Sequence, residues 1–320
     1  MKARGVVFTA PYKVEVWDIE VPEPGPEDLL VRVLYSGISV GTEGWILKNG
    51  YKGVTYPLVT GYQHCGVVER VGSKVEGIRE GELVFGSHGR LVGDVRSMWA
   101  GHLSHAVQAA SQVIKVPEGV LPEEAALGIM PAVPWHGIQM TGIDPGDLVV
   151  VIGLGLVGQF ACQLARTKGG TVIATDILEK RRNLAMECGT DIVLDPRKDD
   201  VNAQVKSVKE AGADVIIDTS ANADAVNASF EWIRRDGRYC LQGYYSGMTP
   251  LDLFLPHVKQ ITFYNPTGYE GVPTMFSYIA KGSVQAKPLI THYIAAEEAP
   301  KAYDLMLNSP QEAVGMVLRW

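Results

Sequence analysis

Residues 147–168 read DLVVVIGLGLVGQFACQLARTK, a pattern that predicts a strand, a glycine turn and a helix in succession. The run LVVVI is continuously aliphatic, as in a strand that is buried on both faces of a parallel sheet. Three glycines follow in G-x-G-x-x-G spacing, and an apolar-periodic helix begins directly after them. Such a turn lets backbone amides and the positive end of a helix bind a pyrophosphate, although glycines alone are also common in simple turns. The residues that this motif predicts as dinucleotide-binding are Gly153, Gly155, Leu156, Val157 and Gly158.

The next predicted strand, TVIATD, ends on Asp176 and supplies the acid that a dinucleotide fold requires. In that fold a carboxylate about 20 residues after the first glycine accepts hydrogen bonds from the adenosine ribose. A carboxylate binds the ribose diol and repels a 2′-phosphate, so Asp176 favours NAD over NADP as the cofactor. Lys180, Arg181 and Arg182 keep NADP open, because an arginine can hold a phosphate; otherwise Arg181 is expected to lie over the adenine.

Strands and helices continue to alternate up to about residue 267, which predicts a doubly wound parallel sheet of the α/β class. One of the predicted helices is ADAVNASFEWIRR, and a last strand, QITFYN, is expected at the sheet edge. An exposed edge invites pairing with a second copy of the chain, which would form a homodimer. Ligands bind at the carboxyl ends of such strands. Four loop residues there are expected near the nicotinamide, although each is equally explained as an ordinary loop residue: Thr219, Ser220, Gly243 and Tyr244.

The first 125 residues or so have a different pattern, with short strands that glycine and proline interrupt. This spacing is typical of a compact barrel. Two polar clusters, SGISVGTEG at residues 36–44 and GYQHCG at residues 61–66, are candidates for chemistry, although turn formation alone accounts for such loops equally well. His64 and Cys65 are adjacent on a predicted strand and should point to opposite faces, so they are not expected to bind one metal ion together. The final strand, AVGMVLRW, is expected to return to this barrel.

The composition indicates a globular protein of the cytoplasm. The 320 residues are enough for two domains, and the net charge of −7 argues against nucleic acid or an anionic membrane as a partner. No long apolar run predicts a signal peptide or a membrane span. The four cysteines are scattered and form no C-x-x-C motif, which is typical of a reducing compartment.

The whole chain resembles the medium-chain dehydrogenase/reductase superfamily. SGISVGTE is similar to that family's S-G-I-C-G-T-D loop, GYQHCGVVERVG to its G-H-E-x-x-G-x-V-x-x-V-G block, and GLGLVGQ to its cofactor turn. The resemblance implies a GroES-like β-barrel catalytic domain at residues 1–127 and 268–320. It also implies a Rossmann NAD-binding domain at residues 128–267.

The departures from the family pattern concern its catalytic zinc site. Ser39 and Val40 stand where the family has the first zinc-ligand cysteine, and Tyr62 and Gln63 replace the histidine and glutamate of the G-H-E block. Without thiolate or imidazole ligands no zinc is expected. Within a zinc-independent branch the chain is most similar to the bacteriochlorophyllide a dehydrogenase-like subgroup, through SGIS-x-GTE, YPLV-x-GY, LITH and a terminal tryptophan.

The resemblance implies hydride transfer between nicotinamide and a secondary alcohol or ketone, with the protein's own hydrogen bonds in place of zinc. Thr42 stands at the family's hydroxyl-relay position and Tyr62 at a former ligand position. Glu43 is expected either to relay the proton or to serve as a structural carboxylate. Weaker catalytic candidates are Gln63, as a supporting amide, and His64, as a base. A small-molecule substrate, apolar or cyclic, would suit the aromatic side chains of Trp45, Tyr51, Tyr56, Trp99 and Trp135, although core or surface packing alone accounts for most of them.

Two other functions remain open from the sequence. An NADPH-dependent enoyl or quinone reductase of the same superfamily also works without zinc, but Asp176 disfavours it. A non-enzymatic sensor that only binds a dinucleotide would keep the glycine turn and need none of the hydroxyl groups near Thr42.

Overall fold

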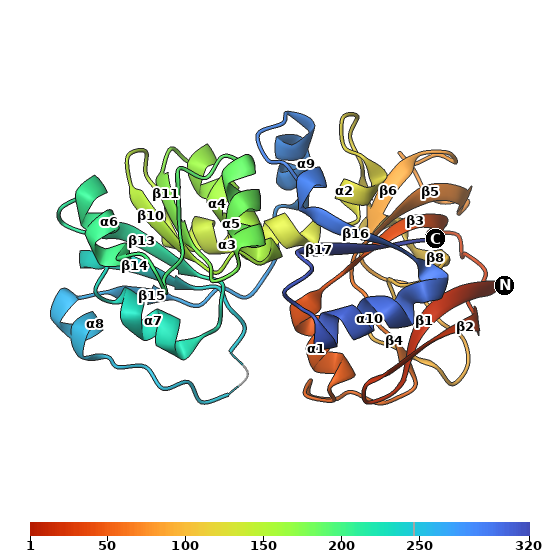
Figure 1. Ribbon diagram of the computed structural model, residues 1–320. Helices are drawn as coiled ribbons and strands as arrows, with labels where there is room; N and C mark the ends of the chain where they lie inside the picture. Colours follow the sequence, from red (N-terminus) through yellow and green to blue (C-terminus); the bar gives the residue numbers. More distant parts are fainter. Residues whose placement is uncertain (246) are drawn as a thin grey trace. The chain divides into compact units, whose positions relative to one another are not determined.

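The computed structural model describes residues 1–245 and 247–320, which form two compact units (Figure 1). Unit 1 comprises Met1–Gly128 and Ile290–Trp320, and unit 2 comprises Ile129–Leu289. Unit 1 is therefore discontinuous, as the returning final strand predicted. In the part of the chain that the structure describes, no helix combines the length and apolar character needed to cross a lipid bilayer.

Unit 1 is built from two β-sheets. One sheet has the strand order β2-β1-β4-β7, and the other has the order β16-β17-β3-β5-β6-β9, with β8 also paired to β3. The first sheet contains β1 (Lys2–Ala10), β2 (Lys13–Glu20), β4 (Leu58–Val59) and β7 (Arg96–Ser97). The second contains β3 (Asp28–Ile38), β5 (His64–Val71), β6 (Leu83–Gly86), β8 (His105–Ala109), β9 (Ile114–Lys115), β16 (Ile290–Ala295) and β17 (Gly315–Arg319).

The C-terminal strand β17 completes the second sheet of unit 1. It runs antiparallel to β3, with Met316 opposite Ile38, and parallel to β16. The helices of this unit are α1 (Val40–Leu47), α2 (Pro122–Ala125) and α10 (Ala299–Asn308), with 3₁₀ turns at Ala110–Gln112 and Ala296–Glu298. Helices α1 and α10 share a core in which Tyr303 meets Phe8 edge to face, with ring centroids 5.0 Å apart.

The described residues of unit 2 form a six-stranded parallel sheet with the order β12-β11-β10-β13-β14-β15. Its strands are β10 (Leu148–Ile152), β11 (Thr171–Thr175), β12 (Ile192–Leu194), β13 (Ala213–Asp218), β14 (Ile233–Leu241) and β15 (Thr262–Tyr264). From β10 the chain continues first to β11 and β12, and then crosses to β13 on the other side of β10. Ligands of doubly wound sheets bind where the strand order reverses in this way, here at the carboxyl ends of β10 and β13.

The helices of unit 2 alternate with these strands from β10 to β15, as predicted. They are α3 (Ile129–Thr141), α4 (Leu156–Thr167), α5 (Glu179–Glu187), α6 (Val201–Val208), α7 (Ala223–Ser229), α8 (Phe254–Lys259) and α9 (Val272–Ala280), followed by a 3₁₀ turn at Lys287–Leu289. Helices α3 and α9 lie before and after the strands in the chain. The expected edge strand is β15, which pairs only with β14 among the described strands.

The structure differs from the sequence-based expectation at one helix. The helix expected across ADAVNASFEWIRR ends at Ser229, and β14 begins four residues later, at Ile233. The reason is that Trp232 and Ile233 are buried in the core of the sheet, and Ala213 of β13 donates its backbone N–H to the Trp232 carbonyl at 2.8 Å. Tertiary contacts therefore override the local helical pattern.

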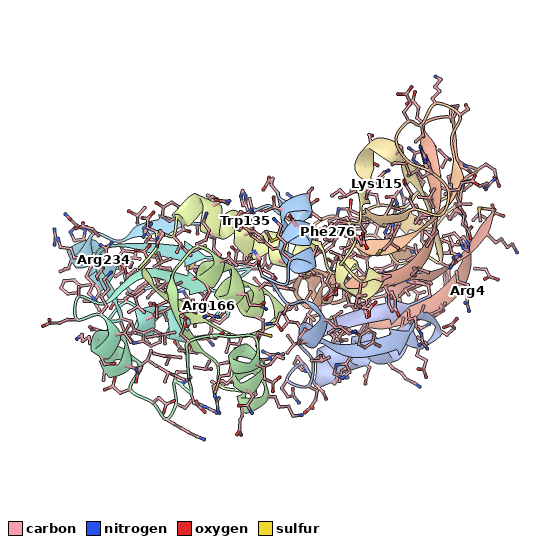
Figure 2. The ribbon with its side chains drawn as sticks, turned by 90° about the horizontal axis from the view of Figure 1, so that it is seen from above. Arg4, Lys115, Trp135, Arg166, Arg234 and Phe276 are labelled. Carbon is pink, nitrogen blue, oxygen red and sulfur yellow. The ribbon has the colours of Figure 1, made fainter. Side chains whose placement is uncertain are left out.

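The structure also differs at a domain boundary, because residues 268–289 belong to unit 2 and not to unit 1. Helix α9 in this segment packs on α3, where Trp135 meets Tyr278 edge to face with ring centroids 5.6 Å apart. Figure 2 shows Trp135 on α3 and Phe276 on α9. In addition, Gln163 of α4 accepts the backbone N–H of Gln285 at 2.7 Å and donates to its carbonyl at 3.1 Å.

Candidate functional site

The predicted glycine turn joins β10 to α4, and two of its glycines are required by the local geometry. Gly153 has a φ of +86°, a left-handed conformation that glycine adopts without strain. A Cβ on Gly158 would lie 1.9 Å from the Gly153 carbonyl oxygen, so only glycine lets α4 approach the turn this closely. At Gly155, in contrast, a Cβ would meet no atom within 4 Å. Open space therefore lies beside the backbone at the start of α4, where a phosphate would approach.

A groove of about 340 Å³ lies beside this turn at the carboxyl ends of the strands. It contains six of the residues predicted to bind the cofactor: Gly153, Gly155, Asp176, Arg181, Thr219 and Ser220. Leu156, Val157 and Gly158 form the first turn of α4. Gly243 and Tyr244 follow β14 and are not among the residues that line the groove. The remaining lining residues are Ile152, Thr175, Ile177, Leu178, Pro196, Asn222 and Ala225.

Asp176 is buried at the end of β11 and is fixed by backbone amides on both of its carboxylate oxygens. Oδ2 accepts the N–H of Leu154, within the glycine turn, at 2.7 Å, and Oδ1 accepts the N–H of Leu178 at 2.7 Å. The Arg181 Nη1 atom lies 3.9 Å from Oδ2. An ionised carboxylate accepts about four hydrogen bonds, so Asp176 keeps acceptor capacity for ribose hydroxyls.

A second buried carboxylate, Asp218, holds two loops together at the carboxyl ends of β13 and β14. Its Oδ1 accepts the Ser220 hydroxyl at 2.6 Å, and its Oδ2 accepts the Tyr245 hydroxyl at 2.5 Å and the Ala221 amide at 3.2 Å. A Cβ on Gly243 would lie 2.9 Å from the same Oδ2 atom, so glycine is needed there. This role of Asp218 was not predicted, although an acid that ends the buried strand VIID is a detectable signal.

The Thr42, Glu43 and Tyr62 candidates lie around the N-terminus of α1 in unit 1. The Tyr62 hydroxyl donates a short hydrogen bond to the Oγ atom of Ser39, which is the N-cap residue of α1. Thr42 is half-buried in the first turn of the same helix. The Tyr62 ring meets Trp99 edge to face at 5.3 Å, and Tyr51 meets Trp99 in the same way at 6.3 Å.

Glu43 is fully buried and accepts three hydrogen bonds within unit 1. Its Oε1 accepts the Ser39 amide at 2.8 Å, and its Oε2 accepts His102 Nε2 at 2.9 Å and the hydroxyl of Tyr303. The Nδ1 atom of His102 is in turn 2.8 Å from Ser36 Oγ, which also accepts the indole N–H of Trp320 at 2.9 Å. These partners are those of a structural carboxylate that joins α1 to α10. His102, Tyr303 and Trp320 were not predicted as partners, because no local sequence pattern links them to Glu43.

Gln63 and His64 follow Tyr62 in the sequence, and both side chains are fully buried. The Gln63 side chain donates to the Gly37 carbonyl at 3.5 Å. Gln108 Nε2 lies 3.0 Å from His64 Nε2, so the amide donates to a neutral ring. Burial lowers the pKa of His64 to about 3, and the charges of His102 and His88 act in the same direction. The structure does not test the catalytic roles predicted for these two residues.

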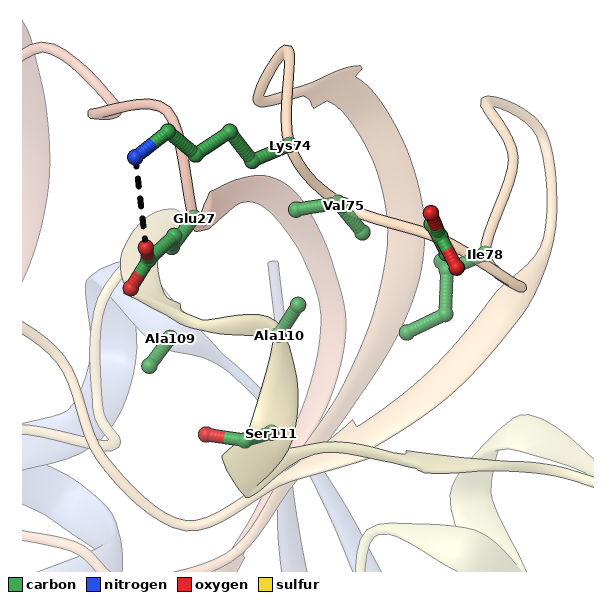
Figure 3. A pocket seen from close by; sticks show the side chains of 8 residues that line it. Glu27, Lys74, Val75, Ile78, Ala109, Ala110 and Ser111 are labelled. Carbon is green, nitrogen blue, oxygen red and sulfur yellow. Dashed lines mark ion pairs between the residues drawn. The ribbon is translucent and has the colours of Figure 1, made fainter.

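Unit 1 contains another groove, of about 320 Å³, which none of the predicted site residues lines (Figure 3). Lys74 and Glu27 form an ion pair of 3.7 Å across it, over a floor that includes Ala109 and Ala110.

Two family models match the sequence, one in each unit. The alcohol dehydrogenase GroES-like domain matches residues 25–122, and the zinc-binding dehydrogenase model matches residues 157–281. These matches agree with a GroES-like barrel domain combined with a Rossmann-type domain, as the sequence predicted.

Similar proteins cover nearly the whole chain. L-threonine 3-dehydrogenase of Deinococcus deserti is 28% identical over 95% of this chain and 96% of its own length. Sorbitol dehydrogenase of Bacillus subtilis is 27% identical over 99% of this chain and 97% of its own length. Among solved structures, a zinc-binding dehydrogenase of Sinorhizobium meliloti, described as putative and bound to NADP, superimposes with a TM-score of 0.87 at 24% identity, covering 100% of both chains.

The side chains at the zinc-ligand positions of the family pattern do not fit a zinc ion. Zinc sites in proteins use thiolate, imidazole and carboxylate ligands. Here the hydroxyls of Ser39 and Tyr62 are bonded to each other, Gln63 offers an amide, and Glu43 already accepts three hydrogen bonds. Among the described residues, no group of three or more histidine, cysteine, aspartate or glutamate side chains is placed to hold a metal ion.

Proposed function

We propose that this chain, which matches an alcohol dehydrogenase GroES-like domain and a zinc-binding dehydrogenase model, is an oxidoreductase of the medium-chain dehydrogenase/reductase superfamily that transfers hydride between NAD(H) and a secondary alcohol or ketone without catalytic zinc. The observation that carries the proposal is the hydrogen bond from Tyr62 to Ser39 at the two positions where the family pattern has zinc ligands. Hydroxyl groups stand in place of metal ligands, so protein hydrogen bonds must stabilise the developing alkoxide.

The groove in unit 2 is the proposed cofactor site. The amides at the start of α4 and the open space at Gly155 suit a pyrophosphate, and Asp176 suits the hydroxyls of the adenosine ribose. Asp218 keeps the loops after β13 and β14 in place, which include Thr219 and Ser220. The bound nicotinamide supplies the hydride acceptor or donor.

Tyr62 is the proposed proton donor to the substrate oxygen in reduction, and the acceptor of that proton in oxidation. Ser39 shares its hydrogen bond, and Thr42 adds a half-buried hydroxyl on the same helix turn. Glu43 is assigned a positioning role, because it holds the Ser39 amide and thereby the start of α1. Gln63 and His64 stay as supporting candidates, the latter as a neutral ring.

The substrate proposed is a small apolar or cyclic alcohol or ketone. The edge-to-face contacts among Tyr51, Trp99 and Tyr62 present aromatic surface next to the proposed proton donor, which suits a planar substrate. The similarity to the bacteriochlorophyllide a dehydrogenase-like subgroup stays a prediction. It would be tested by adding hydroxyethyl-substituted chlorins to a panel of secondary alcohols, polyols and β-hydroxy amino acids.

Substituting Tyr62→Phe tests the mechanism. We expect kcat to fall on the order of 10²-fold, as for the loss of one transition-state hydrogen-bond donor, while NADH affinity stays unchanged. Tyr12→Phe is the control, because it removes the hydroxyl of an exposed tyrosine outside this aromatic group and should leave kcat unchanged. Equal activity of the wild type and Tyr62→Phe with every accepted substrate would remove Tyr62 from the mechanism.

Metal dependence tests the other half of the proposal. We expect purified protein to contain far less than one zinc per chain, and chelation to leave kcat unchanged. Stoichiometric zinc, with activity that is lost on chelation and restored by zinc, would overturn the metal-free mechanism. Activity with NADPH and enones alone would instead identify the enoyl or quinone reductase.

A further inference from the structure

The rim of the cofactor groove carries three arginines close to Asp176. Arg181 and Arg182 lie in the first turns of α5, and Arg197 lies in the loop after β12, next to the groove residue Pro196. NADP differs from NAD only by a 2′-phosphate on the adenosine ribose, and proteins hold such a phosphate with guanidinium groups. The availability of these arginines therefore bears directly on which dinucleotide binds.

Arg182 is held by acceptors at the ends of β11 and β12. Its Nη1 atom donates to the backbone carbonyl of Asp176 at 2.7 Å and lies 3.3 Å from Asp195 Oδ2. Only 15% of its side chain is exposed. A phosphate at the ribose would have to compete with both of these acceptors for the guanidinium.

Arg197 is engaged more completely, by a two-point ion pair. Its Nε donates to Asp195 Oδ1 at 2.9 Å, its Nη2 donates to Asp195 Oδ2 at 2.8 Å, and Nη2 also donates to the Ile177 carbonyl at 2.6 Å. Paired donors of this kind have the geometry that a guanidinium would otherwise offer to a phosphate.

Asp195 is therefore the common partner of both arginines, and Lys198 Nζ also lies 4.0 Å from its Oδ2 atom. It is buried at the end of β12, its own amide donates to Asp199 Oδ2 at 2.7 Å, and the hydrogen bonds from Arg197 hold its pKa well below the usual range. One ionised side chain thus binds the two arginines that flank the loop from Asp176 to Leu178. Arg181 is the cation that lines the groove itself, 3.9 Å from Asp176.

We propose that Asp195 is a coenzyme-specificity residue, which rejects NADP by binding Arg182 and Arg197 so that neither can hold a 2′-phosphate. The inference rests on the proposed NAD(H)-dependent function and deepens it. Selectivity then depends on two carboxylates: Asp176 repels the phosphate directly, and Asp195 withholds two of the three nearby arginines that could offset this repulsion. Specificity is a difference between two affinities, and it is often obtained by weakening the unwanted complex in this way.

The test measures dissociation constants of NADH and NADPH by fluorescence titration of the full-length protein and of Asp195→Asn. Asparagine keeps the shape of the side chain but loses the charge that holds the two guanidinium groups. We expect NADPH to bind about tenfold more tightly to the variant, as for one additional charged hydrogen bond, with NADH affinity changed less than about twofold.

Three control variants separate the proposed contact from a general effect of charge. Asp199→Asn removes the same charge from the same loop, but Asp199 pairs with no arginine among the described residues, so the NADPH affinity should stay that of the wild type. In Asp195→Asn combined with Arg197→Gln, the gain in NADPH affinity should disappear. The single variant Arg197→Gln removes a positive charge and leaves the negative charge of Asp195 less neutralised. NADPH should therefore bind to this variant no more tightly than to the wild type.

The outcomes distinguish this inference from the proposed function. Wild-type protein that binds neither dinucleotide would overturn both. NADH binding with an unchanged NADPH-to-NADH ratio in Asp195→Asn, or an equal gain in Asp199→Asn, would overturn the role of Asp195 and leave the proposed function standing. Tighter NADPH binding by Arg197→Gln alone would also contradict the inference, and this result does not depend on the folding of Asp195→Asn.

Discussion

At the scale of single residues, His64 shows how burial changes the response of the protein to pH. The pKa of this side chain falls from an ordinary 6.5 to about 3 in the folded protein. Between these values the unfolded chain binds a proton that the folded chain does not, so the free energy of unfolding falls as the pH drops below 6.5. We expect His64→Gln to lessen this fall by about 1.4 kcal/mol per pH unit. Urea denaturation of the wild type and of His64→Gln between pH 6.5 and 4 measures this pH dependence. His257→Gln, which removes an exposed histidine, is the control. Identical slopes of the unfolding free energy against pH for all three proteins would contradict the prediction.

At the scale of helices and strands, the buried carboxylate of Glu43 joins α1 to α10. Tyr303 donates its hydroxyl to Glu43 from α10, and burial together with the negative charge of Glu43 raises the pKa of this tyrosine well above its usual value. Tyr303→Phe keeps the ring in the core but removes one donor from a buried charge. We expect a loss of about 1–3 kcal/mol in the free energy of unfolding. Tyr293→Phe, at a tyrosine that is 47% exposed, is the control, and an equal change in both variants would contradict the role of this bond.

At the scale of the whole molecule, the edge of the unit 2 sheet is the proposed site of homodimerisation. Strand β15 pairs only with β14 among the described strands, and the neighbouring segment exposes Leu253, Phe254 and Val258. An unpaired edge beside exposed apolar side chains favours association with a second copy. We expect light scattering to give a dimer for the wild type and a monomer for Phe254→Glu. Tyr12→Glu, at an exposed tyrosine of unit 1, should stay dimeric, and a monomeric wild type would exclude this dimer.

The elements that could be predicted from the sequence are those that local patterns define. The aliphatic run before Gly153, the glycine spacing and the acid at Asp176 are close in sequence, and each follows from backbone geometry. The structure accordingly confirms the order of strands and helices around them and brings Asp176 to the glycine turn.

The features that could not be predicted depend on contacts between distant segments. Glu43 meets His102 and Tyr303 from far along the chain, and the pairing of Asp195 with Arg182 follows from the order of two strands in the sheet. In the same way, the start of β14 is set by burial of Trp232 and not by its local pattern. These partners and boundaries are determined by tertiary packing, and the sequence of a single segment does not specify them.

The discontinuous unit 1 has a consequence for synthesis on the ribosome. Residues 129–289 are translated between the two parts of this unit, so unit 2 can reach its full length while the sheet of unit 1 still lacks β16 and β17. Until those strands emerge, the end of β3 that pairs with β17 has one unpaired side in the nascent chain. A chain that ends near residue 290 would therefore contain all of unit 2 attached to a unit 1 that lacks β16 and β17, and its unpaired strand edge would favour aggregation or chaperone binding.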